Sequence, residues 1–281
     1  MTARPTAAFL PDGRRLHLNH GPIDLIIEVF GPERESCYGQ ATRRFETVLT
    51  GLVSELPALR TPIMDGHRFT NPIARRMAKA VQPHRDVFVT PMAAVAGAVA
   101  DEMLEALIAD RQVPKAYVNN GGDIAFHLTS GERITAAGPA GPIEIGYDDD
   151  TRGLATSGTG GRSHSFGIAD AVTVAARTAA EADAAATLIA NAIDLPGHPA
   201  ISRERASDLS PDSDLGDRLV TTSVGRLAGD EVEEALRQGE ALACRMRAEG
   251  RIREAALSLK GQVRVVASEP ETRNAGVLLH A

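Results

Sequence analysis

The pattern of apolar positions along the chain predicts strands near its start and a long helix after them. Apolar and polar residues alternate over 14–20 and again over 23–30, which indicates two strands joined in a hairpin. From Glu35 to Leu56 apolar residues recur instead at helical spacing, and Pro57 follows. Because proline cannot continue a helix, we expect one amphipathic helix that packs on the sheet and ends before Pro57.

Four further helices carry recognisable signals. One is expected over residues 72–81 and another over 230–249. A third begins at Thr90, a suitable N-cap that is followed by proline, and its body is almost entirely Ala, Val and Gly. Such small residues permit either close approach to a sheet or a ligand, or tight packing in the core. The fourth begins after Thr178, with Glu181 three residues later in a capping-box pattern.

Shorter apolar runs predict further strands, at 116–128 (two strands around an Asn/Gly turn), 143–147, 171–175, 219–224, 255–259 and 263–267. Residues 202–217 are acidic and contain Ser and Pro, so we expect a loop there. Hairpins mixed with long helices, without regular βαβ alternation or an internal repeat, predict an α+β fold with mixed or antiparallel sheets and packed helices.

The composition is that of an ordinary soluble globule whose core consists of small aliphatic residues. The 281 residues are 43% hydrophobic and only 4% aromatic, with no Trp. This length suits one domain over 1–281 with two interdependent lobes. The formal charge of −7 comes without a basic face, which argues against nucleic acid as a partner. A bound polyanion would need local positive potential from a cation, a helix N-terminus or an Arg.

The cysteines and the apolar runs indicate the compartment. Cys37 and Cys244 lie far apart, and neither belongs to a C-x-x-C pair or has zinc-ligand spacing to a His, so free thiols are expected. The N-terminal residues lack the apolar core of a signal peptide, and no run approaches the ~20 apolar residues of a membrane span. We therefore expect a cytoplasmic protein that does not associate with membranes.

The first candidate binding segment is the turn formed by Asn119, Asn120, Gly121, Gly122 and Asp123. Its glycines permit positive φ angles and expose N–H groups, while Asn and Asp side chains can bind a ring edge or a ribose. The alternative is a tight hairpin stabilised by Asx hydrogen bonds.

The second candidate is the loop from 156 to 163, which combines hydroxyls, glycines and an Arg able to grip a phosphate with two hydrogen bonds. Thr156, Ser157, Gly158 and Arg162 are its candidate ligand-binding residues. It matches neither the P-loop nor the dinucleotide glycine pattern, so ATPase and Rossmann-type functions lose support. A flexible surface loop is the alternative.

The third candidate is a metal site on the helix that follows Thr178. Asp183 and Thr187 are four residues apart, so they project from one face and can offer a carboxylate and a hydroxyl to one hard cation such as Mg²⁺. Alternatively, Asp183 caps or pairs locally and the Thr187 hydroxyl bonds back to a helix carbonyl.

The order of these blocks, N-x-G-G-D, the glycine-rich loop and A-D-x-x-x-T, resembles the ApbE superfamily, whose best-known members are Mg-dependent FAD:protein FMN transferases. The resemblance is closest to its uncharacterised, cytoplasmic branch, and it covers most of the chain. It implies that the turn at 119–123 lines a flavin nucleotide site and that Asp183 and Thr187 bind Mg²⁺. The implied ligand is FAD, with water or the hydroxyl of an unidentified protein acceptor attacking its diphosphate.

Two departures from the transferases affect the expected chemistry. Their D-P-x-T-G sequence is missing after His164, so His164 and Asp170 are rival candidates for a catalytic base. Their A-K-G-Y core is replaced by residues 95–98, Val-Ala-Gly-Ala, which supply no Lys. The sequence therefore leaves open Mg-dependent FAD cleavage or FMN transfer, a non-catalytic flavin or nucleotide binder or accessory protein, and a homo-oligomeric scaffold without a ligand.

Overall fold

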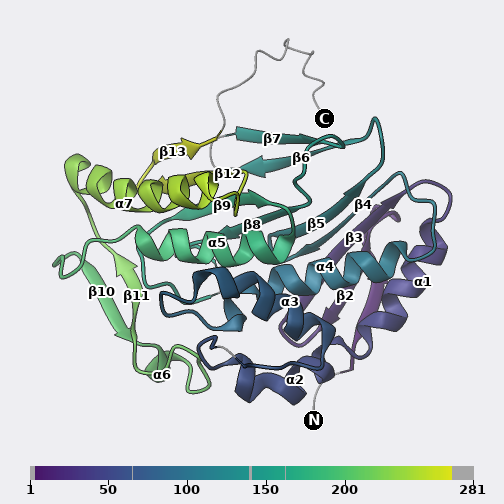
Figure 1. The fold of residues 1–281 in the computed structure, drawn as a ribbon, viewed down its shortest axis with the longest axis horizontal. Helices are drawn as coiled ribbons and strands as arrows, with labels where there is room; N and C mark the ends of the chain where they lie inside the picture. The colour runs from purple at the N-terminus through teal and green to yellow at the C-terminus, as the bar shows by residue number, and fades with distance from the viewer. Residues whose placement is uncertain (1–3, 65, 139–140, 162, 268–281) are drawn as a thin grey trace.

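The computed structural model describes residues 4–64, 66–138, 141–161 and 163–267, which form a broad antiparallel sheet with helices packed on it (Figure 1). The strands are β1 (Thr6–Phe9), β2 (Leu16–His20), β3 (Ile23–Phe30), β4 (Lys115–Asn120), β5 (Asp123–Leu128), β6 (Arg133–Gly138), β7 (Gly141–Gly146), β8 (Gly153–Ser157), β9 (Ala171–Ala176), β10 (Ile201–Arg205), β11 (Leu219–Val224), β12 (Glu254–Leu259) and β13 (Gln262–Val266). The helices are α1 (Arg34–Phe45), α2 (Val48–Leu59), α3 (Pro72–Val81), η1 (Gln82–His84), η2 (Pro91–Ala94), α4 (Val95–Ile108), α5 (Ala179–Ala192), α6 (Ala206–Leu209) and α7 (Gly229–Ala248). The expected α+β class is confirmed.

The main sheet brings the two glycine-rich segments of the sequence to one place. Its strand order is β1-β2-β3-β4-β5-β8-β9-β12-β13, and neighbouring strands are antiparallel. The β4–β5 turn and the β8–β9 loop therefore leave the sheet at the same end of its strands. The hairpin predicted over 14–30 and the two strands predicted around the turn in 116–128 are confirmed as β2–β3 and β4–β5. The two strands predicted at 255–259 and 263–267 are present as β12 and β13, which pair with each other.

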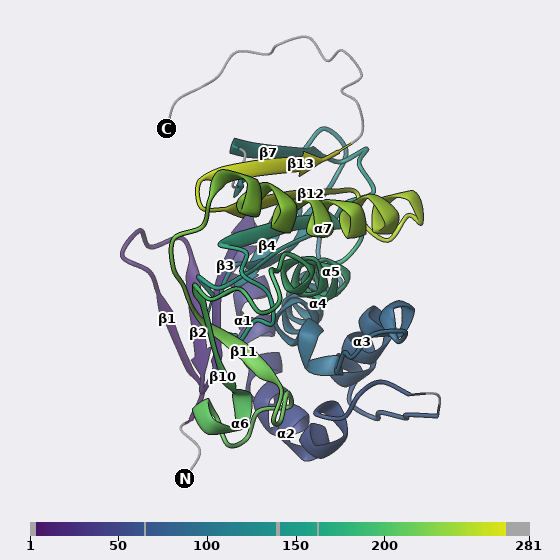
Figure 2. The same ribbon diagram turned by 90° about the vertical axis from the view of Figure 1, so that its left-hand side faces the viewer.

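The helices cover one face of this sheet, and the β6–β7 hairpin covers part of the other. Figure 2 shows α3, α4 and α5 on one side of the strands. Alternation along β4 buries Ala116 and Val118 in the main core. On the opposite face Phe126 and Leu128 of β5 pack with Ile145 of β7 in a smaller cluster.

Helices α4 and α5 approach each other closely because the contact between them has almost no side chains. A Cβ atom on Gly97 would lie 2.2 Å from the carbonyl oxygen of Ala179, so only glycine fits there. The neighbouring Ala98, Val99 and Ala100 are completely buried. The small-residue helix expected after Thr90 is thus a tightly packed core helix, preceded by the short η2.

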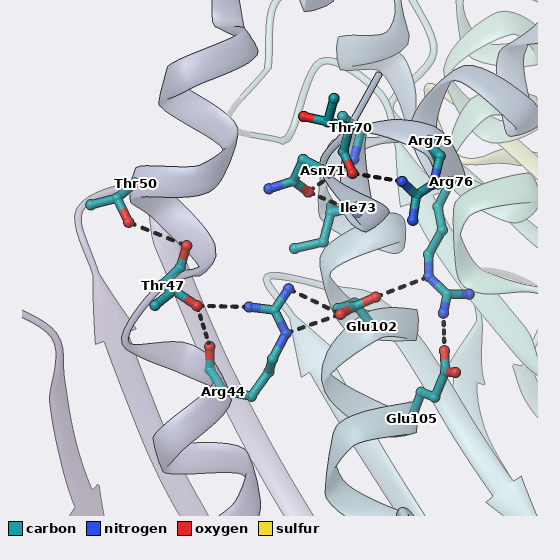
Figure 3. Close-up of polar contacts among 11 residues, drawn as sticks. Arg44, Thr47, Thr50, Thr70, Asn71, Ile73, Arg75, Arg76, Glu102 and Glu105 are labelled. Atoms are coloured by element: carbon teal, nitrogen blue, oxygen red, sulfur yellow. Dashed lines mark hydrogen bonds and ion pairs between the residues drawn. The ribbon is translucent and has the colours of Figure 1, made fainter. Parts of the chain in front are cut away.

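A network of charged side chains joins α1, α3 and α4 (Figure 3). The Glu102 carboxylate on α4 pairs with Arg44 at the end of α1 at 2.9 Å and with Arg76 of α3 at 3.3 Å. Arg76 also pairs with Glu105. The Arg44 guanidinium donates to the Thr47 hydroxyl at 3.0 Å, which ties α1 to the start of α2.

The single helix expected over 35–56 is wrong, because the chain bends at residues 46–47 and forms α1 and α2 separately. Pro57 does not end the second helix either; it lies inside α2, which continues to Leu59. The N–H that proline lacks would have bonded to the Val53 carbonyl. Since α2 ends two residues after Pro57, this lost hydrogen bond falls in its last turns, where the helix tolerates it.

The loop expected over 202–217 is also wrong at its start, where β10 pairs with β11 and is followed by the short α6. The residues of β10 are mostly exposed, so the strand has no buried face to create an apolar alternation. Strand β1 is fully exposed and β6 is partly exposed. Because neither strand has a buried face, the apolar pattern of the sequence did not indicate them.

Both cysteines are free thiols as expected, with Cys37 buried and Cys244 exposed. In the described residues, no helix combines the length and the apolar character needed to cross a membrane.

Candidate functional site

The Asn/Gly turn between β4 and β5 is a tight hairpin that is fixed to the start of α4. Gly121 and Gly122 have φ angles of 65° and 113°, in the region that favours glycine. The Asn119 side chain accepts from the Gly122 N–H at 2.8 Å, which is an Asx hydrogen bond of the kind that stabilises a tight hairpin. The Asn120 amide donates to the Ala96 carbonyl at 3.0 Å, so the turn and the beginning of α4 are held together.

A pair of carboxyl groups lies beside this turn. Asp123, the first residue of β5, is buried and accepts from the Thr156 N–H of β8 at 3.2 Å. Asp183 of α5 accepts from the Gly97 N–H at the start of α4 at 3.0 Å. Asp183 also lies within hydrogen-bonding reach of Asp123. Burial and the negative charge of Asp123 raise the pKa of Asp183 well above its ordinary value.

Helices α4 and α5 are joined by a second contact between an aspartate and backbone N–H groups. The Asp101 carboxylate on α4 accepts from the N–H groups of Ala179 and Ala180 at the start of α5, at 3.0 and 2.9 Å. Each helix therefore binds the N-terminal amides of the other through an aspartate, a contact favoured by the helix dipole. Asp183 differs from Asp101 in lying within hydrogen-bonding reach of a second carboxyl group.

This arrangement suits a hard divalent cation. Asp123, Asp183 and, one turn along the same face of α5, Thr187 are oxygen donors of the kind that Mg²⁺ prefers. A cation would relieve the repulsion that raises the pKa of Asp183. No group of three or more His, Cys, Asp or Glu side chains suited to a metal exists within the described ranges, so water or phosphate oxygens would complete the coordination of Mg²⁺.

The loop at 156–163 contacts the carboxyl pair Asp123–Asp183 through a backbone N–H group rather than through side chains. The Thr156 N–H contacts Asp123, but its hydroxyl bonds to the Thr173 hydroxyl at 2.8 Å. Ser157 is partly buried at the end of β8, and Gly158 has a φ of 144° and lies against the Asp170 carbonyl. Arg162 lies outside the described residues.

The two candidates for a catalytic base make their hydrogen bonds elsewhere. His164 Nε2 lies 3.2 Å from the Ser210 hydroxyl. The carboxylate of Asp170 accepts from the Lys260 N–H in the β12–β13 turn at 2.5 Å, and Asp170 itself is exposed. Neither side chain has a hydrogen bond to Asp123 or Asp183 among the described residues.

Sequence reasoning missed Asp101, which is as important to the helix pair as Asp183. A signal was present, since Asp101 is an acidic residue within the small-residue run that starts at Val95. Such a residue on an otherwise apolar helix needs a buried partner. The partner, the start of α5, lies about eighty positions later, and only the fold reveals it.

Comparison with known proteins places the chain in a family. The family model described as "AbpE bacteria" matches residues 7–265. A UPF0280 protein of Methanopyrus kandleri is 32% identical over 197 residues, which cover 67% of this chain and 78% of that protein. A UPF0280 protein of Methanothrix thermoacetophila is 40% identical over 128 residues, which cover 43% of this chain and only 52% of that relative.

Among solved structures, a variant of the flavin transferase ApbE from Vibrio cholerae is similar at 12% identity with a TM-score of 0.48, over 95% of this chain and 98% of that one. The family model matches nearly the whole chain, including the turn, both helices and the loop of the candidate site. The chain therefore belongs to the ApbE-like family that this model describes.

Proposed function

We propose that this protein binds a flavin nucleotide together with Mg²⁺ at the Asp123 and Asp183 carboxyl groups, and that it cleaves FAD at the diphosphate or transfers FMN from it. The observation that supports this proposal is the pairing of the buried Asp123 carboxyl with the partly buried Asp183, which is held by a helix N-terminus and has a raised pKa. A pair of this kind is costly to maintain unless a proton or a cation lies between the two groups. Functional sites are where such perturbed carboxyls concentrate.

In this proposal the protein's own residues position the ligand. Asp123, Asp183 and Thr187 hold the cation, which supplies positive charge to the diphosphate oxygens. The Thr156 and Gly97 amides keep the two carboxylates in place. The glycine turn at 119–123 and the loop at 156–163 lie at the same end of the sheet and border the nucleotide. Phosphoryl chemistry depends mostly on positioning and charge neutralisation, which these elements can provide.

A second candidate function is non-catalytic binding of a flavin or another nucleotide, as a carrier or as an accessory to another enzyme. The hydrogen bonds of His164 to Ser210 and of Asp170 to the Lys260 N–H favour it, because both candidate bases are engaged away from the carboxyl pair. For either function we propose a cytoplasmic protein of one domain with two interdependent lobes that assembles into a homo-oligomer.

The test is calorimetric titration with FAD in the presence and absence of Mg²⁺, followed by chromatography for AMP and FMN. Under the proposal FAD binds with micromolar affinity only when Mg²⁺ is present, and Asp183→Asn abolishes the binding. Asp148→Asn is a matched control, because Asp148 is an exposed aspartate between β7 and β8, at the opposite end of β8 from the loop at 156–163. Binding without product would select the second function, whereas no heat at millimolar FAD would refute the first and would leave the second only with a nucleotide other than FAD.

A further inference from the structure

A cavity of about 1070 Å³ opens on another side of α5. It lies between the C-terminal half of α5, helix α7, strands β10 and β11, and the segment 83–88. No described residue of the carboxyl site lines it, so this cavity is separate from the proposed cation site. Its volume is in the range of pockets that bind small organic molecules.

The interior of this cavity is apolar. Leu188 of α5 and Met246 of α7 are buried in its wall, and Leu242 is partly buried beside them. Two aromatic rings, Phe88 and Phe166, complete the wall with centroids 6.2 Å apart and planes tilted by 58°. Flat aromatic surfaces and branched aliphatic groups favour the body of a planar, apolar ligand.

Two of the four arginines in the lining are neutralised by the protein itself. The half-buried Arg203 pairs with Asp194 and also donates to the Phe166 carbonyl. Arg251 pairs with Glu249 at 2.8 Å. These pairs fix the wall of the cavity and leave no net charge.

The other two arginines have no carboxylate partner in the described part of the chain. The Arg218 guanidinium lies 3.4 Å from the centroid of the Phe88 ring, and one of its N–H groups donates to the Leu215 carbonyl at 3.4 Å. Because stacking uses the face of the guanidinium, its other N–H groups remain available to a ligand. Arg245 lies exposed on α7 in the same lining. Asp86 is the one lining acid without an ion-pair partner there, so these three unpaired groups sum to one positive charge in a chain of net charge −7.

Uncharged polar groups complete the lining. His84 is buried and its Nδ1 accepts from the Arg251 guanidinium at 3.3 Å, so the ring is neutral. The Asn191 carbonyl oxygen accepts from the Phe166 N–H at 2.9 Å, and its NH₂ group has no acceptor among the described residues. The cavity thus offers hydrogen-bond donors and positive charge around an apolar interior.

We propose that this cavity is a second ligand site, which binds a small organic anion with a flat apolar body. The body packs against Phe88, Phe166 and Met246, and Arg218 and Arg245 hold the anionic group. The proposal is independent of the flavin and Mg²⁺ site.

The experiment is a fluorescence titration with 1-anilinonaphthalene-8-sulfonate, a flat apolar anion, and with its uncharged analogue N-phenyl-1-naphthylamine. We expect saturable binding of one sulfonate per chain, and an affinity lowered about tenfold or more in the double variant Arg218→Gln/Arg245→Gln, because charged hydrogen bonds are lost. The uncharged analogue should be unaffected by that double variant. Arg237→Gln, which removes an exposed arginine of α7 outside the lining, is the control and should change nothing.

A filled cavity gives the second readout. Met246→Trp should prevent binding of both probes, and Leu242→Trp tests the same point if circular dichroism shows that the first variant does not fold. Asp183→Asn should leave the titration unchanged, which separates this site from the carboxyl site. Absence of saturable sulfonate binding, equal affinity in the double arginine variant, or undiminished binding in a folded cavity-filling variant would each overturn the proposal.

Discussion

Replacing Asp183 or Asp101 by Asn separates a structural helix contact from a cation site. Both carboxylates accept hydrogen bonds from the N-terminal amides of the opposite helix. Asp183 also lies within hydrogen-bonding reach of a second carboxyl group, Asp123, whereas the Glu181 carboxylate acts on Asp101 through its charge alone. The two substitutions therefore compare an aspartate that is paired with a second carboxyl group with one that is not.

The two substitutions should change the free energy of unfolding at neutral pH differently. Asp101 accepts two N–H groups, and the amide of Asn has only one acceptor oxygen, so Asp101→Asn leaves one amide unsatisfied and costs about 1–3 kcal/mol. The Asp183 carboxylate accepts from the Gly97 N–H, and Asn can keep that contact. Burial raises the pKa of both aspartates in the folded protein, and the charge of Asp123 adds to the rise at Asp183, whereas the two amides oppose it at Asp101. A carboxyl whose pKa is raised contributes stability at low pH that is lost as pH rises through the folded pKa. At neutral pH Asp183→Asn should therefore be neutral or stabilising.

The assay is thermal unfolding followed by circular dichroism, with and without Mg²⁺. A cation present at 100 times its Kd stabilises the folded state by about 2.7 kcal/mol, which is about 5–10 °C in Tm for a domain of this size. The unchanged protein and Asp101→Asn should both gain this increment, and Asp183→Asn should not. An equal gain in all three proteins, or in none, would refute the cation site.

Three further predictions follow from other parts of the structure. Burial, and secondarily Arg251, lowers the pKa of His84 from 6.5 to about 4, so the unfolded chain binds more protons and the fold should lose about 3 kcal/mol as pH falls from 6.5 to 4; urea titrations of His84→Gln should lack this loss. Gly97→Ala should destabilise the protein by about 1–3 kcal/mol, because its Cβ would lie 2.2 Å from the Ala179 carbonyl oxygen, whereas Gly39→Ala on α1, with its nearest neighbour at 3.5 Å, should not. Incubation with FAD, Mg²⁺ and a transferase target peptide should yield slow release of AMP and FMN and little flavinylated peptide by mass spectrometry, since the Lys of the A-K-G-Y block is absent; efficient flavinylation would contradict this.

The sequence was most informative where one face of an element is buried. The hairpin at 14–30 and the helix at 72–81 have a regular apolar pattern, and the structure confirms both. The bend at residues 46–47 has no glycine or proline, and the Arg44 contacts that accompany it come from another helix. Strand β10 is largely exposed and stabilised only by β11, so its residues show no alternation.

The candidate site was predictable in its parts and not in its assembly. Asp183 and Thr187 were expected on one face of a helix, and α5 confirms that placement. Asp123 was expected in a turn that binds a ring edge or ribose, with no indication that it faces Asp183. That proximity arises from the antiparallel order of β5, β8 and β9 and from the close approach of α4 to α5 at Gly97. Contacts between residues sixty positions apart are set by such packing, which local pattern does not encode.

The charges of the site imply an order of binding under the proposed function. A diphosphate that approaches Asp123 and Asp183 without a cation meets two carboxyl groups and no lysine, because Val95 to Ala98 replace the basic block of the transferases. The Gly97 amide that would attract an anion already donates to Asp183. Among the described residues of the carboxyl site, positive potential therefore comes from the cation itself, so we infer that the cation binds before the nucleotide. By linkage, the factor by which Mg²⁺ raises the affinity for nucleotide is the factor by which nucleotide raises the affinity for Mg²⁺. The missing lysine thus makes the site depend on its metal for binding as well as for chemistry.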